Sequence, residues 1–217
     1  MPTYKSGMSD SDIMDRYQRS CRTNFWQAIF RKEVDYLTSH LKGAKDILSV
    51  GCGPAIIENE LSKKGFRITG MDVSREALNA SPDSIRTVVG NAEEMPLPTS
   101  SFDAAIYVAS LQFIGDYQKA IAEVNRVLRP NGKVIVLLLN PQSAFFQQRF
   151  RDPDSYVRQI RHKDLKAIEE AIEKDFTVRS EYYLGVQGDI VFDSSDVDKA
   201  ALYVIVGTRR GTEGSRI

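Results

Sequence analysis

The middle of the chain alternates short apolar runs with amphipathic segments of helical length. Each apolar run is long enough for one buried strand, and turn residues separate it from the segment that follows. Such alternation predicts a parallel, doubly wound α/β sheet with right-handed crossovers. The expected strands are residues 46–50, 67–71, 86–89, 103–108 and 133–139, and the expected helices are residues 54–64, 75–80 and 116–128.

The segment ahead of the first strand, Ser11 to Leu41, carries apolar and aromatic residues at helical intervals. It predicts two helices that form an N-terminal helical cap.

The chain after the last expected parallel strand follows a different pattern. Pro141 to His162 reads as too polar for the core, and a helix is expected near Asp164 to Asp175. Two final strands, 177–184 and 201–206, are joined by the short connection 185–199, which favours an antiparallel pair. We therefore expect one domain over residues 1–217, with a cap (1–44), a ligand-binding core (45–140) and a substrate-side segment with the last strands (141–217).

Composition narrows the classes of function. The 217 residues, 42% of them hydrophobic, suffice for one full core. Lysine plus arginine equals aspartate plus glutamate at 29 each, so no global field attracts nucleic acid. The two cysteines provide neither a disulfide framework nor metal-ligand spacing, and no apolar run is long enough to span a membrane. The expectation is a soluble cytoplasmic protein acting on a small molecule; the oligomeric state stays open.

A glycine turn follows the first strand. Gly51 and Gly53 remove the Cβ atoms that would keep a ligand from the backbone, and Pro54 suits the first turn of a helix that Gly65 can end. A structural strand-to-helix turn is the alternative explanation. Asp72, at the end of the second strand and about 20 residues on, favours a binding turn, because an acidic side chain there can bind ribose hydroxyls. The bulky Ile56 disfavours a nicotinamide dinucleotide, and with it an oxidoreductase.

Several segments in register resemble class I S-adenosylmethionine-dependent methyltransferases, and most closely their type 11 small-molecule branch. They are Ile47–Ala55, Asp72, Gly90–Leu97, Phe102–Ile106 and Glu123–Lys133. The resemblance implies a Rossmann-like, seven-stranded, mostly parallel sheet whose reversed last strand lies beside the fifth. It also implies S-adenosylmethionine as the cofactor, with S-adenosylhomocysteine as its product.

The resemblance also implies which residues bind the cofactor. The glycine turn would hold the aminoacyl end, Asp72 the ribose and Val73 the adenine. Asn91 stands where the family usually has aspartate, and its amide oxygen can still accept a hydrogen bond; a simple turn residue is the alternative. The expected cofactor-binding residues are Gly51, Cys52, Gly53, Asp72, Val73, Asn91, Ala92 and Val108. Cys52 also reads as a small buried filler.

Catalytic residues are harder to identify from the sequence. Methyl transfer is an in-line displacement that depends mainly on positioning, so at most one base is needed. No base stands out: the family often has histidine at the position of Gln112 or Phe113. Metal ligands are not expected, because His40 and His162 are isolated from each other.

Candidate substrate residues come from the cap and from the segment after the fifth strand. Aromatic rings could cover the site, although such rings more often pack helices together. The local positive excess between Arg149 and Lys163 either meets an anionic substrate or is a solvated face. The candidates are Tyr17, Trp26, Gln112, Tyr156 and His162. The sequence thus predicts methyl transfer to an unidentified small acceptor; the alternative is a catalytically silent module that binds cofactor or a protein.

Overall fold

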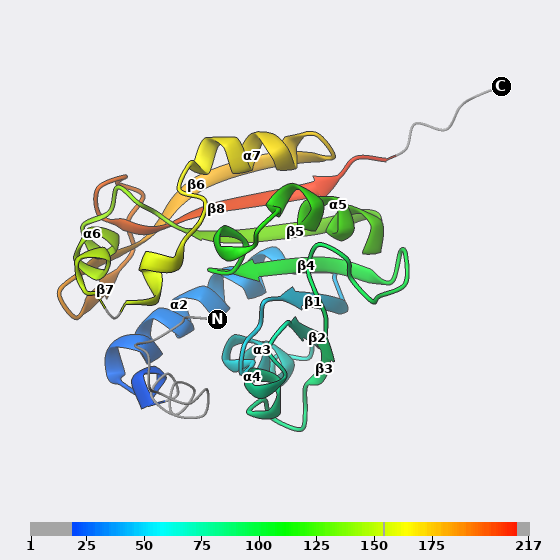
Figure 1. The fold of residues 1–217 in the computed structure, drawn as a ribbon, viewed down its shortest axis with the longest axis horizontal. Coiled ribbons are helices and arrows are strands. Elements are labelled where there is room, and N and C mark those ends of the chain that lie inside the picture. The colour runs from blue at the N-terminus through cyan, green and yellow to red at the C-terminus, as the bar shows by residue number, and fades with distance from the viewer. Residues whose placement is uncertain (1–18, 154, 212–217) are drawn as a thin grey trace.

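A single twisted sheet forms the centre of the molecule (Figure 1). The computed structural model describes residues 19–153 and 155–211. Within them the strand order is β3-β2-β1-β4-β5-β8-β6-β7. Strands β1 to β5 are parallel to one another, and β8 pairs antiparallel with both β5 and β6. The strands are β1 (Asp46–Val50), β2 (Arg67–Asp72), β3 (Arg86–Val89), β4 (Phe102–Val108), β5 (Leu128–Leu139), β6 (Phe176–Gln187), β7 (Ile190–Phe192) and β8 (Ala200–Arg209).

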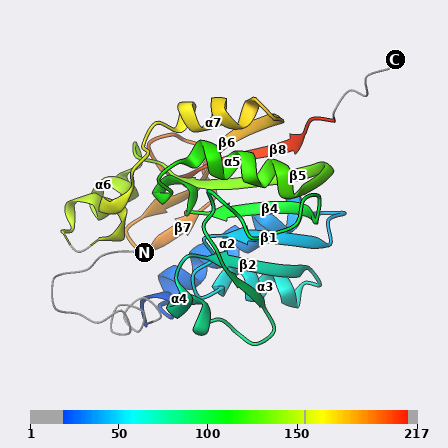
Figure 2. The ribbon, with the colours of Figure 1, turned by 45° about the vertical axis from the view of Figure 1, so that its right-hand side comes forward.

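Helices pack on both faces of the sheet (Figures 1 and 2). One face packs against α5 and α7, and the opposite face packs against α2 and α3. The described helices are α2 (Asn24–His40), α3 (Ile56–Lys63), α4 (Arg75–Asn79), α5 (Tyr117–Val127), α6 (Ala144–Arg151) and α7 (Leu165–Glu173), with short 3-10 turns η1 (Leu111–Phe113) and η2 (Tyr156–Gln159). None of the described helices is long and apolar enough to cross a membrane.

The core is divided into two layers by the sheet. In β4, Ala105 and Tyr107 belong to the cluster with α5 and α7, whereas Ala104 and Ile106 belong to the cluster with α2 and α3. All four residues are fully buried. A strand whose central residues are buried on both faces is typical of a parallel sheet covered on both sides, which confirms the doubly wound α/β architecture.

The C-terminal strands confirm the expected reversal. The last strand, β8, lies beside β5 and runs against it. The described sheet has eight strands rather than the expected seven, because the connection between β6 and β8 contains the three-residue strand β7.

Two local expectations were wrong. The helix expected from Pro54 begins at Ile56, because Ala55 adopts a left-handed conformation (φ 56°) that cannot belong to an α-helix. The segment 141–162, expected to be too polar for the core, buries Phe145, Phe146 and Val157. The many polar residues of this segment made its apolar face hard to recognise. The two buried phenylalanines lie in the first turn of the short helix α6.

The N-terminal cap is described in part. Helix α2 confirms the second of the two expected helices, and the first lies mostly outside the described residues. Figure 1 shows the start of α2, α6 and β7 at the left, where the parallel strands end. In an α/β sheet this edge is where ligands bind.

Candidate functional site

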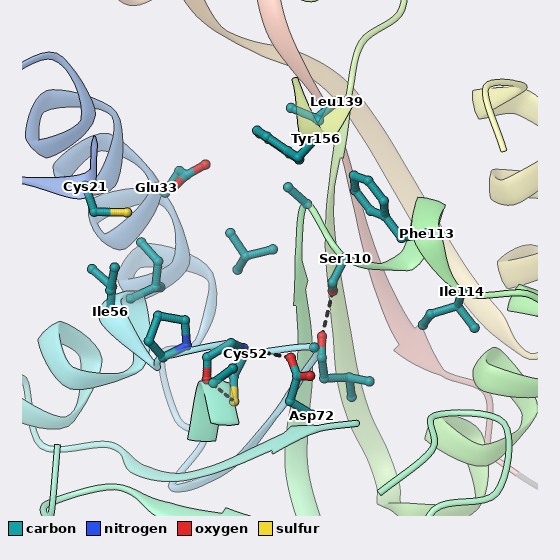
Figure 3. A pocket seen from close by; sticks show the side chains of 18 of the residues that line it. Cys21, Glu33, Cys52, Ile56, Asp72, Ser110, Phe113, Ile114, Leu139 and Tyr156 are labelled. Carbon is teal, nitrogen blue, oxygen red and sulfur yellow. Dashed lines mark hydrogen bonds between the residues drawn. The ribbon is translucent and has the colours of Figure 1, made fainter. Parts of the chain in front are cut away.

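A cavity of about 730 Å³ lies at the carboxyl ends of the parallel strands. Its lining includes the ends of β1, β2, β4 and β5, and residues of α2, α3 and α6 (Figure 3). The site expected from the sequence therefore coincides with a real cavity, bounded on one side by the sheet and on the other by the cap.

The glycine turn forms one wall of this cavity. Gly51 (φ +73°) and Gly53 (φ +54°) both adopt left-handed conformations that favour glycine. A Cβ on Gly51 would lie 2.6 Å from Ser110 Cβ, whereas a Cβ on Gly53 would meet nothing within 4 Å. A side chain at position 51 would therefore clash with Ser110, whereas a side chain at position 53 would enter open space beside the cavity.

Asp72 joins the ends of the two neighbouring strands. Its Oδ2 accepts a hydrogen bond from the Gly53 N–H (2.9 Å), and its Oδ1 accepts one from the Ser74 N–H (2.9 Å). Helix α4 has its own cap, since Ser74 Oγ accepts from the Ala77 N–H. Each carboxylate oxygen has a further lone pair for a ligand. Asp72 therefore shapes the turn and still offers acceptors to the cavity.

A second acid lies behind the turn. Glu58 of α3 is almost completely buried and accepts a hydrogen bond from Ser49 Oγ at 2.5 Å. Burial raises the pKa of Glu58 to about 7, although the hydrogen bond from Ser49 lowers it. Cys52 packs close to Gly70, and burial raises the pKa of its thiol. A neutral thiol is a poor nucleophile, which agrees with Cys52 as a packing residue.

The expected adenine side lies along β2 and the loop after β3. Val73 is 63% exposed, and Ala92 is buried. Asn91 Oδ1 accepts the Glu93 N–H (3.0 Å), so its amide oxygen already stabilises a turn. All eight residues expected to contact the cofactor line the cavity: Gly51, Cys52, Gly53, Asp72, Val73, Asn91, Ala92 and Val108.

Aromatic side chains line the opposite end. Trp26 packs against Phe30 (6.0 Å between ring centroids), and Tyr156 packs against Phe113 (6.0 Å). The Arg149 guanidinium lies 5.4 Å from the Trp26 ring centroid, a cation–π distance. Of the expected substrate residues, Trp26 and Tyr156 line the cavity. Tyr17 lies outside the described residues.

Gln112 and His162 do not line the cavity. Gln112 is completely buried; its Nε2 donates to the Leu139 carbonyl (3.1 Å), and its Oε1 accepts the Leu139 N–H (2.7 Å). His162 Nε2 lies 2.8 Å from the Ile114 carbonyl. Both side chains tie η1 to neighbouring segments. A single histidine or glutamine in a sequence gives no sign of such a long-range backbone contact.

Sequence reasoning missed two buried acids of the cavity, Glu58 and Glu33. Glu33 is 5% exposed and lines the cavity from α2. It lies on the buried face of the helix, four residues after Ile29 and four before Leu37. A charged residue within an apolar stripe was the signal that could have identified it.

Burial and, to a lesser extent, the nearby Glu58 raise the pKa of Glu33 to about 8. Among the described residues, no hydrogen-bond donor or cation pairs with its carboxyl group. An unpaired acid in an apolar environment costs stability, and such groups are typical of functional sites.

The described residues contain no group of three or more histidine, cysteine, aspartate or glutamate side chains placed to hold an ion.

Comparison with known proteins agrees with this geometry. Residues 48–136 match the family model of a methyltransferase domain of type 11. The demethylmenaquinone methyltransferase of Staphylococcus epidermidis is 34% identical over 131 residues, which cover 55% of this chain and 54% of the relative. A protein of Methanocaldococcus jannaschii is 25% identical over 66% of this chain and 63% of its own length. The chain thus spans about half to two thirds of these relatives.

Solved structures share the fold over nearly the whole chain. A Thermotoga maritima protein described as a "SAM-dependent methyltransferase, possible histamine N-methyltransferase" superposes with a TM-score of 0.77, at 19% identity, over 92% of this chain and 97% of that one. A SAM-dependent methyltransferase of Archaeoglobus fulgidus gives 0.72 at 13% identity, over 90% and 99%. Residues 48–136 thus form a methyltransferase domain, within a fold that the chain shares with S-adenosylmethionine-dependent methyltransferases of known structure.

Proposed function

We propose that this chain transfers the methyl group of S-adenosylmethionine to a small-molecule acceptor bound in the same cavity. The observation that carries the proposal is the joining of the glycine turn to Asp72 at the cavity wall. That bond places a bare stretch of backbone next to a carboxylate, and a sulfonium nucleoside needs both.

The chemistry of the wall suits each part of this nucleoside. Asp72 offers carboxylate oxygens to the ribose hydroxyls, and the exposed Val73 offers an apolar surface to adenine. No side chain caps the first turn of α3, so its N–H groups are available to a carboxylate. Gly53 leaves the space that the aminoacyl end would need.

Positioning is the main task of these residues. When bound, S-adenosylmethionine supplies an electrophilic methyl group on a positively charged sulfur. The carboxylate of Asp72 gives this wall of the cavity a negative charge that favours such a cation. The aromatic residues of α2 and η2 exclude water and hold the acceptor at the other end. Orienting two reactants in this way contributes roughly 7–11 kcal/mol to catalysis.

Isothermal titration calorimetry with S-adenosylhomocysteine tests the proposal. We expect a saturable binding event with one site per chain. Asp72→Asn should weaken it about 10- to 100-fold, since a hydrogen bond to a charged group contributes about 1.5–3 kcal/mol.

Asp83→Asn makes the same chemical change at an exposed position and is the control. The proposal fails if folded wild-type protein does not bind S-adenosylhomocysteine, or if both variants bind it equally well.

A further inference from the structure

Glu33 lines the cavity from α2, and none of the proposed cofactor contacts uses its carboxyl group. Asp72 is held by the turn and Glu58 by Ser49. Glu33 has no such partner among the described residues, although it is only 5% exposed.

The surroundings of Glu33 are apolar and aromatic. Trp26, Ile29 and Phe30, from the same helix, line the cavity with it. In Figure 3, Glu33 points from α2 into the cavity, in the half that contains Tyr156 and Leu139, away from Asp72. This is the part of the cavity that remains for an acceptor if the ribose binds at Asp72.

The charges around the cavity favour a cation. Its described lining contains five acidic side chains (Glu33, Glu58, Asp72, Glu93 and Asp152) and two basic ones (Arg149 and Arg161). Among residues 19–153 and 155–211, the charged and titratable groups that act on Glu33 or are acted on by it are Glu58 of α3 and Tyr183 of β6. Neither is a cation, so a positively charged ligand would give this carboxylate a counter-ion that the described residues do not supply.

We propose that Glu33 binds the ammonium group of an amine acceptor and accepts a proton from it, with the aromatic side chains of α2 and η2 holding an apolar, preferably aromatic, body. This inference rests on the proposed function. It adds the class of acceptor and a residue that touches it.

The step balances as follows. The Glu33 carboxylate takes one proton from the ammonium, which leaves a lone pair on nitrogen. The new N–C bond forms as the C–S bond breaks, and the electron pair of the broken bond stays on sulfur. The product leaves as a methylated ammonium ion, and Glu33 gives its proton to solvent. A general base with a pKa near neutrality is effective in this role, and burial raises the pKa of Glu33 to about 8.

Matched amines and alcohols test the charge requirement directly. The probes are benzylamine, 2-phenylethylamine and tryptamine, each against the alcohol with the same carbon skeleton. Each is titrated by calorimetry into protein saturated with S-adenosylhomocysteine. We expect at least one amine to bind about tenfold more tightly than its alcohol, and Glu33→Gln to remove most of this preference.

Three controls separate a direct contact from a structural effect. Glu60→Gln changes an exposed glutamate of α3 and should leave the amine preference intact. Glu33→Asp should restore part of it. The affinity of Glu33→Gln for S-adenosylhomocysteine should stay within about twofold of wild type.

Distinct outcomes would overturn the inference. Amines that bind no better than alcohols, or a preference that survives in Glu33→Gln, would exclude an ion pair with Glu33. Weaker binding of S-adenosylhomocysteine by Glu33→Gln would make Glu33 a cofactor ligand instead. Wild-type protein that fails to bind S-adenosylhomocysteine at all would remove the proposed function, and the inference with it.

Discussion

The buried carboxyl group of Glu33 makes the stability of the protein depend on pH. Its folded-state pKa, about 8, lies above the ordinary value of 4.5 because burial disfavours the charged form. Between pH 4.5 and about 8, the Glu33 carboxyl group is therefore protonated in the native state and ionised in the unfolded chain. The resulting stabilisation is complete below about pH 4.5 and is lost as the pH rises through 8.

Glu33→Gln should therefore stabilise the protein in alkaline solution. Near pH 5 the wild-type side chain is neutral and resembles glutamine, so the two melting temperatures should agree. Near pH 9, Glu33→Gln should melt at least about 5 °C higher, since one pKa unit corresponds to about 1.4 kcal/mol and 1 kcal/mol moves Tm by about 2–4 °C at this size. Differential scanning calorimetry at both pH values measures this. Equal melting temperatures at high pH would show that the Glu33 carboxylate is solvated.

The two glycines of the turn should respond differently to alanine. Both substitutions strain a left-handed backbone by about 1 kcal/mol, but only the Cβ of Gly51→Ala would clash, with Ser110. Gly51→Ala should therefore lower Tm more than Gly53→Ala does.

Gly53→Ala should fold and bind S-adenosylhomocysteine at least about tenfold more weakly, because its Cβ occupies ligand space. Thermal melts and calorimetry on the same samples separate the two effects. Normal binding by Gly53→Ala would contradict a close approach of ligand to this backbone.

At the scale of elements, the sequence predicted the parallel strands well. The bounds of β1 and β3 agree exactly with the expected ranges, and Asp116 and Asp164 cap α5 and α7 as their sequences suggest. These features depend on local periodicity and local hydrogen bonds, which a sequence displays directly. The place of β8 between β5 and β6 came from the family resemblance, because periodicity alone does not order strands.

The connections between elements were less predictable. Gln112 joins η1 to the end of β5, a contact between residues 27 positions apart. Phe145 and Phe146 are buried where α6 packs on β6 and β8. Such contacts form only in the tertiary structure, so the local sequence pattern of a short polar segment does not predict them.

Replacing Gln112 tests its role as a connection. Gln112→Leu leaves the Leu139 N–H without its side-chain acceptor, and each buried unsatisfied group costs about 1–3 kcal/mol. We expect Tm to fall by at least about 4 °C, with the affinity for S-adenosylhomocysteine changed by less than about threefold in folded protein.

Gln118→Leu, at an exposed position of α5, is the matched control for this substitution. A Gln112→Leu variant that melts like wild type but no longer binds S-adenosylhomocysteine would place Gln112 in the site instead.

At the scale of the whole molecule, the sheet and the cap contribute different residues to the cavity. The strand ends supply the glycine turn and Asp72, which the sequence identified because a fixed spacing along two adjacent strands marks them. The cap supplies Trp26 and Glu33. The role of Glu33 was missed because only the folded protein brings α2 over the strand ends.

A crystal structure of the protein with S-adenosylhomocysteine tests the central claim most directly. The account predicts the ribose hydroxyls within hydrogen-bonding distance of the Asp72 carboxylate, the aminoacyl group against Gly51 to Gly53, and the sulfur facing the half of the cavity that contains Glu33. A nucleoside bound with its ribose away from Asp72, or outside this cavity, would contradict it.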